Sequence, residues 1–287
     1  MINEGRGISE LNKEETKNLF NIFQKEGYQT FEHQILNRII EVTFSEGNYD
    51  SKFYKKSGEY YMLITCPKDY NDIKLKTIIT HELNHFIEIS KIENKKYRYP
   101  NYDKIKKSLI EFNPESKQLQ FFKHIIYKTL DNEINANVSQ TYTYLRNFNS
   151  SDEDYLRSKL EEYEMRREYQ DLLNFNISKF KNDIKINNVN FDKFNKILAN
   201  NGVDDFLDFI YERNVDKYID NWFKIIKSNI KKLLKKQDII IKEVIEDINK
   251  LDNYSSEYPI TENIILNYTE YLKENLKNND KLDQKLI

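Results

Sequence analysis

The alternation of apolar and polar residues along the chain predicts mostly helices, with two short strands near the amino terminus. Residues 10–38 fit an opening helix that is interrupted around Gly27. Residues 38–44 (RIIEVTF) and 59–66 (EYYMLITC) are rich in β-branched and aromatic side chains and are bounded by turn-like segments, which is typical of strands. We expect these two strands to pair as a small antiparallel sheet.

Two long helices are predicted in the middle of the chain. Over residues 72–90, apolar side chains recur at helical spacing along two neighbouring stripes, which indicates a helix that is buried on more than one side. A charged loop through Pro100 and Pro114 is expected to follow. The helical pattern returns over residues 115–148, and we expect this segment to be the second central helix.

Beyond Ser150 the pattern changes to charge-rich helices, and no internal repeat is evident. Further helices are expected at 203–236, 238–251 and 261–277. This change predicts a boundary near residue 150, between an α+β domain (1–150) and a helical carboxy-terminal region (151–287). The expected fold class is therefore α+β and predominantly helical.

Composition narrows the choice of partners. The 45 basic residues nearly cancel the 47 acidic ones, so no overall field favours nucleic acid or an anionic membrane. The amino terminus lacks the basic start and apolar core of a secretory signal, and no stretch approaches the roughly 18 apolar residues of a membrane span. We therefore expect a soluble and initially cytoplasmic protein. Its single cysteine, Cys66, excludes an internal disulfide.

The predicted helix at 72–90 contains the pattern HExxH, formed by His81, Glu82 and His85. Residues four positions apart lie on the same face of a helix, so both imidazoles can reach one metal ion. Zinc in a catalytic site takes three protein ligands and keeps a fourth position for a water, whose pKa the metal lowers towards neutrality. Glu82 can take the proton of that water as general base and pass it to a leaving amine.

A third ligand is needed from elsewhere in the chain. The metzincin extension of this motif requires Gly at position 88 and His at position 91, where this chain has Glu88 and Lys91, so that class is excluded. The remaining histidines are His33 and His124, and a carboxylate from a later helix is the better candidate. The segment DNEINAN offers Glu133 as that carboxylate.

The face of the second central helix around Glu133 supports this choice. Ala136, Asn137 and Gln140 fall near the same azimuth, and the small Ala136 allows close approach to the HExxH helix. Asn137 lies one turn beyond Glu133 and is expected to accept an imidazole N–H from a metal-bound histidine. His124, nine residues before Glu133, should point to the opposite side of the helix.

HELNH followed by a helical NExxAN resembles the gluzincin clan of zinc metallopeptidases, in which a second helix supplies a glutamate ligand. The pattern of Glu133, Ala136 and Asn137 is also similar to the ExxAN of ImmA/IrrE-type peptidases. The resemblance covers about 58–148 and implies a zincin-like catalytic domain within 1–150, Zn²⁺ as cofactor and a protein or peptide substrate. It further implies that the 58–66 strand is the edge strand that pairs with an extended substrate.

The chain departs from the gluzincin pattern in three ways. His85 and Glu133 are 48 positions apart (133 minus 85), longer than in compact members, so an inserted loop is expected around 92–114. Asn137 stands where thermolysin-like enzymes carry a carboxylate. No oxyanion-stabilising residue can be assigned, because Tyr142 should lie opposite Glu133 and Tyr144 about three turns away, which leaves Tyr60, Tyr61 and residues of the carboxy-terminal helices open.

An active zinc endopeptidase is the function that these residues favour. A non-catalytic interaction protein or virion-associated protein with a zincin fold is the alternative, which the unassigned oxyanion group and Asn137 leave open. A third hypothesis is a DNA-linked regulator with a peptidase-like domain in the ImmA/IrrE manner. A helix-turn-helix would favour that hypothesis, and none is evident in the sequence.

Overall fold

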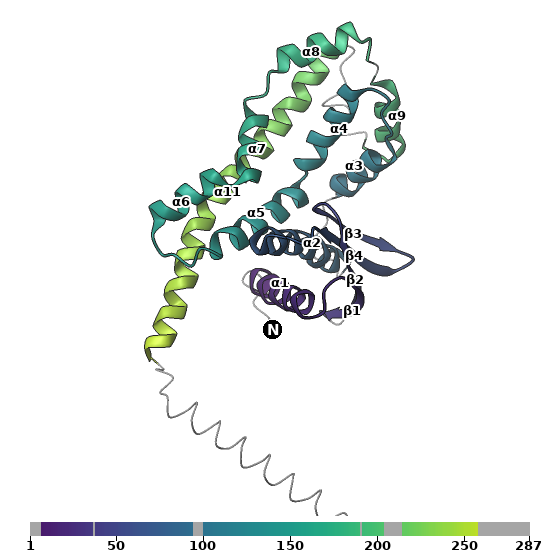
Figure 1. The fold of residues 1–287 in the computed structure, drawn as a ribbon. Coiled ribbons are helices and arrows are strands. Elements are labelled where there is room, and N and C mark those ends of the chain that lie inside the picture. Colours follow the sequence, from purple (N-terminus) through teal and green to yellow (C-terminus); the bar gives the residue numbers. More distant parts are fainter. Residues whose placement is uncertain (1–6, 37, 94–99, 190, 204–213, 258–287) are drawn as a thin grey trace, which may run out of the picture.

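The computed structural model describes residues 7–36, 38–93, 100–189, 191–203 and 214–257. The chain is predominantly helical, with one small sheet formed by segments near its amino terminus (Figure 1). The first elements are α1 (Gly7–Glu26), β1 (Thr30–Ile35), β2 (Arg38–Glu46), β3 (Asp50–Lys56) and β4 (Glu59–Cys66). The central helices are α2 (Asp72–Glu93), α3 (Pro100–Glu111), α4 (Lys117–Lys128) and α5 (Asp131–Arg146). The predicted α+β class is confirmed at this level.

The described strands form a mixed sheet in the order β1-β2-β4-β3. β1 pairs with β2 and β3 pairs with β4 in antiparallel fashion, whereas β2 and β4 run parallel, with Val42 opposite Met62. The predicted antiparallel pairing of 38–44 with 59–66 is therefore wrong. The reason is β3, which turns back into β4 through Ser57 and Gly58. Both have positive φ, 53° and 93°, as a tight hairpin turn requires.

The sequence pattern did not predict either edge strand of the sheet, and it placed the wrong strand at the edge. β1 lies in the segment predicted as an opening helix, and β3 lies in the segment predicted as turns. Both strands are polar and partly exposed, so neither shows the apolar run that identifies a buried strand. β4 is paired on both sides, so the expectation that 58–66 is an edge strand is wrong, and β3 occupies that edge.

α2 is the central helix of the fold. Its residues Leu75, Ile79, Leu83 and Phe86 belong to the core cluster that includes the inner face of the sheet and α1. On other sides α2 packs against α1 and α5 (Figure 1). The predicted helix at 72–90, buried on more than one side, is confirmed.

The segment after α2 differs from the prediction in two respects. The expected loop at 92–114 contains helix α3. The expected helix at 115–148 is two helices, because α4 ends at Lys128 and α5 begins at Asp131. The hydroxyl of Thr129 donates to the carbonyls of Ile125 at 2.9 Å and Ile126 at 3.1 Å, which closes the last turn of α4. This break lets α5 start in its own direction, with Glu133 in its first turn.

The carboxy-terminal region contains α6 (Glu153–Glu162), α7 (Glu164–Leu173), α8 (Ile177–Ile186), α9 (Asp192–Asn200) and α11 (Val215–Glu257). α11 is one continuous helix of 43 residues where two were predicted, and the helix predicted at 261–277 lies outside the described residues. The core clusters include residues from both sides of residue 150. Phe122 of α4 packs against Trp222 of α11, and Leu145 of α5 is in the same core cluster as Ile241 of α11. No described helix is long and apolar enough to cross a membrane.

Candidate metal centre

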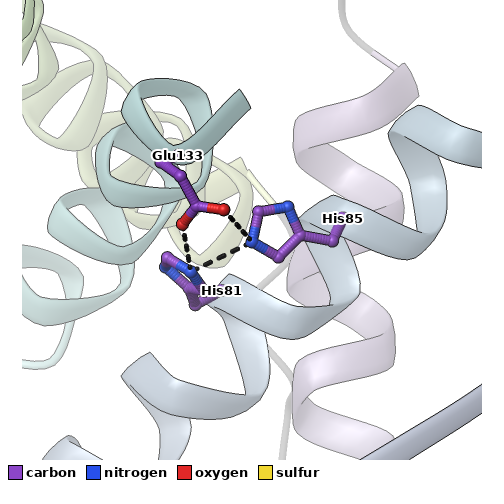
Figure 2. Close-up of side chains that lie close together, drawn as sticks. All are labelled: His81, His85 and Glu133. Atoms are coloured by element: carbon purple, nitrogen blue, oxygen red, sulfur yellow. Dashed lines mark hydrogen bonds and ion pairs between the residues drawn. The ribbon is translucent and has the colours of Figure 1, made fainter. Parts of the chain in front are cut away.

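His81 and His85 on α2 and Glu133 on α5 converge on one point (Figure 2). The Nε2 atoms of His81 and His85 lie 3.1 Å apart. The Oε2 atom of Glu133 lies 3.3 Å from Nε2 of His81, and its Oε1 atom lies 3.4 Å from Nε2 of His85. The two histidines are one turn apart on α2, and the first turn of α5 crosses that turn.

These separations test whether the three side chains fit a metal ion. Bonds of about 2.0 to 2.1 Å at tetrahedral angles place two ligand atoms about 3.3 to 3.4 Å apart. The two imidazole nitrogens lie 3.1 Å apart, and they lie 3.3 and 3.4 Å from two different oxygens of the Glu133 carboxylate, which is close to that value. Two imidazoles and one carboxylate are also ligands that suit zinc and other first-row metals. The two imidazoles and the carboxylate therefore fit one metal ion.

Burial and charge favour a cation at this point. Glu133 and His85 are only 5% and 6% exposed. Burial alone would raise the pKa of Glu133, but the hydrogen bonds and charges of His81 and His85 outweigh it, and the net pKa is lowered. An ionised and buried carboxylate is costly unless cationic or hydrogen-bonding groups surround it. A metal ion together with two imidazoles provides that compensation.

Glu82 follows the candidate ligand His81 directly in the sequence and is 5% exposed. Its carboxylate accepts a hydrogen bond from the hydroxyl of Ser51, with Oγ and Oε1 2.6 Å apart. Ser51 is the second residue of β3, the edge strand that the sequence prediction missed. Sequence spacing gives no indication of this contact, because the two residues are 31 positions apart.

A cleft of about 870 Å³ opens at His81. Tyr49 and the first two residues of β3, Asp50 and Ser51, line one part of it, and residues 162–165 at the junction of α6 and α7 line another. Tyr144 also lines the cleft, and its ring stacks on that of Tyr163 with centroids 4.2 Å apart. The carboxy-terminal region therefore contributes part of the wall around the candidate metal centre, which the sequence did not indicate.

Asn137 does not make the contact expected of it. Its Nδ2 atom donates to the hydroxyl of Tyr169 at 2.6 Å, and its Oδ1 atom is buried without a hydrogen-bond partner. It therefore forms no hydrogen bond to either imidazole. Burial lowers the pKa of His81, but Glu133, Glu82 and Gln140, which is on the same face of α5 as Asn137, together raise it.

His33, His124 and Tyr142, which were considered from the sequence, make their contacts away from the candidate metal centre. His33 is on β1 and pairs with Glu15, and His124 is exposed on α4. The hydroxyl of Tyr142 donates to Asp247 at 2.7 Å. Tyr127, which the sequence pattern did not indicate, lies near the candidate metal centre: burial, the charge and hydrogen bonding of Glu133 and the charge of Glu82 raise the pKa of its phenol.

Tyr169 connects the carboxy-terminal region to the helix that carries Glu133. Its buried hydroxyl accepts from Asn137 and donates to the carbonyl of Lys128 at 3.0 Å. We expect Tyr169→Phe to lower the free energy of unfolding by about 1 to 3 kcal/mol, because buried polar groups lose their partner. Zinc affinity should fall roughly tenfold, as for other groups that support a metal ligand indirectly.

Chemical denaturation and zinc titration of Tyr169→Phe measure these two effects. The matched control is Tyr155→Phe, which removes the hydroxyl of a tyrosine that is 41% exposed on α6. Equal stability and zinc affinity in the two variants would contradict a supporting role for Tyr169.

Comparison of this chain with family models, with curated proteins and with solved structures finds no match. The geometry of the candidate metal centre is therefore the basis for a functional assignment.

Proposed function

We propose that this chain is a zinc-dependent metallopeptidase with a zincin-like catalytic domain. In this proposal His81, His85 and Glu133 hold the zinc ion and Glu82 is the general base. The observation that carries the proposal is the convergence of two imidazole nitrogens and one carboxylate at separations close to those of metal ligands, with a glutamate that follows the first histidine directly. The cleft at His81 provides access for a substrate.

Zinc in such a site acts as a Lewis acid and lowers the pKa of a coordinated water towards neutrality. Glu82 takes a proton from the attacking water as its oxygen bonds to the peptide carbonyl carbon. The same carboxyl then gives that proton to the amine nitrogen as the C–N bond breaks, so the products are a carboxylic acid and an amine. Burial of Glu82 beside the cleft suits this exchange, because little bulk water competes for its proton.

The edge of the sheet supports a peptide as the substrate class. β3 is paired only with β4, so its outer backbone N–H and C=O groups have no strand partner among the described residues. An extended peptide can pair with such an edge as an added strand. Tyr49, Asp50 and Ser51 line the cleft where β3 begins, which would bring a peptide paired with β3 close to His81.

Metal analysis combined with a peptide-cleavage assay tests the proposal. We expect about one zinc ion per chain, hydrolysis of some members of a mixed peptide library, loss of hydrolysis on chelation and its return with zinc. A chain that binds zinc but cleaves no peptide or denatured protein would support the non-catalytic interaction protein instead. A chain that binds no metal would refute both the zinc centre and the reaction.

A further inference from the structure

We infer that Ser51 is a positioning residue that holds the carboxylate of Glu82 in the orientation needed for proton transfer. This inference rests on the proposed function, because Glu82 must be the general base for its orientation to matter. The hydroxyl of Ser51 donates to Oε1 of Glu82 at 2.6 Å, a short bond to a charged acceptor. Among the described residues, the structure records no other hydrogen bond to the Glu82 carboxylate.

The packing of β3 on α2 explains why Ser51 faces Glu82. Phe53, two residues along the strand, lies on the same face as Ser51 and packs edge-on against Phe86, with ring centroids 5.9 Å apart. Two strand residues span about 6.7 Å, and four helix residues span about 6 Å. Ser51 with Glu82 and Phe53 with Phe86 are therefore two successive contacts between the same strand and the same helix. The apolar contact fixes the register at which the hydroxyl meets the carboxylate.

The hydrogen bond has a direct chemical consequence for a general base. A glutamate side chain rotates about three bonds, so an unrestrained carboxylate spends part of its time in orientations that cannot reach the water. A donor on Oε1 restricts these rotations and leaves Oε2 available to accept a proton. Misplacement of a catalytic group by about 1 Å can reduce the rate about 100-fold. Loss of the hydroxyl should therefore affect kcat more than substrate binding.

The opposite role is also testable. If the Ser51 hydroxyl instead competed with water for the Glu82 carboxylate, its removal would free the base and increase kcat. The position of Ser51 on the edge strand separates an effect on kcat from an effect on substrate binding, because the backbone of β3 remains paired with β4 whichever side chain stands at position 51. A peptide paired with that backbone would therefore bind Ser51→Ala about as well as the wild type.

The experiment compares Ser51→Ala and Ser51→Thr in the full chain loaded with zinc. We expect Ser51→Ala to lower kcat about 10- to 100-fold, with KM within about twofold and with zinc content and Tm unchanged. Ser51→Thr keeps the hydroxyl on a β-branched side chain suited to a strand, and it should retain most of the activity. The matched control is Ser45→Ala, because Ser45 contacts Thr65 at 2.9 Å between β2 and β4 and does not line the cleft.

A second comparison separates positioning from a general effect on the fold. In a Glu82→Gln background, Ser51→Ala should change the residual rate by less than about twofold, because the base it orients is absent. An unchanged or higher kcat in Ser51→Ala, or an equal fall in both backgrounds, would overturn the inference. If the wild type itself shows no hydrolysis, the proposed function fails and the inference fails with it. An active wild type with a fully active Ser51→Ala refutes only the positioning role.

Discussion

Glu82→Gln is expected to lower kcat by at least about 100-fold while zinc remains bound and the fold remains intact. The amide has nearly the same shape as the carboxylate, and its oxygen can still accept the hydrogen bond from Ser51. An amide cannot take a proton at neutral pH, so the step assigned to Glu82 is lost. KM should change little, because the substitution alters neither the cleft wall at residues 162–165 nor the edge of β3.

Steady-state hydrolysis of one cleaved peptide, with zinc content measured on the same preparation, checks this result. The matched control is Asp72→Asn, the same carboxylate-to-amide change at the exposed first residue of α2, which should leave kcat within about twofold. A Glu82→Gln variant that keeps more than a tenth of the wild-type rate would exclude Glu82 as the general base. Hydrolysis would then have to use a different proton acceptor, or come from a contaminating enzyme.

The sequence predicted the parts of the candidate centre that depend on helical periodicity. The spacing of His81 and His85 places both on one face of α2 whatever the tertiary structure, and the apolar stripes of that helix require burial. The small and apolar residues on the same helical face as Glu133 similarly favoured this carboxylate as the third ligand. The structure brings these three side chains together. Their roles as zinc ligands remain a prediction.

Periodicity could not indicate the contacts between distant segments. Ser51 was missed because β3 is a polar edge strand and its partner Glu82 is 31 positions away. The expected contact of Asn137 with a histidine failed for a related reason. Helical periodicity places Asn137 and Gln140 on the same face of α5, but the packing of α7 against that face decides which group Asn137 contacts. The hydroxyl of Tyr169, 32 positions further along the chain, accepts the hydrogen bond of the Asn137 amide.

The sheet shows a third limit of sequence patterns. The two strands with apolar, β-branched composition were predicted correctly as strands, because burial on the side of α2 demands that composition. Their relative direction depends on the number of strands between them. One unrecognised strand, β3, reverses the chain once more and converts the expected antiparallel pair into a parallel one.

Glu133→Ala should weaken zinc binding by more than about 100-fold and abolish hydrolysis with it. Two imidazoles alone leave the ion short of one protein ligand and of the negative charge that balances it. Even groups that only support a ligand typically contribute 10- to 100-fold in affinity, so loss of a ligand should exceed that range. Competition with a chromophoric chelator measures the affinity. Asp131→Ala, an exposed carboxylate in the same first turn of α5, is the matched control.

Thermal unfolding provides a second measurement of the same substitution that does not depend on catalysis. A ligand present at 1,000 times its Kd stabilises the folded state by about 4 kcal/mol, so zinc should raise the Tm of the wild type and of Asp131→Ala by several degrees. At the same zinc concentration, a site weakened about 100-fold stabilises the fold by only about 1.4 kcal/mol, so the zinc-dependent Tm shift of Glu133→Ala should be about a third of the wild-type shift or less. An unchanged zinc-dependent shift in Glu133→Ala would mean that the ion is held elsewhere, for example at His124 or His33. The gluzincin-type centre on α2 and α5 would then be wrong even though the protein binds zinc.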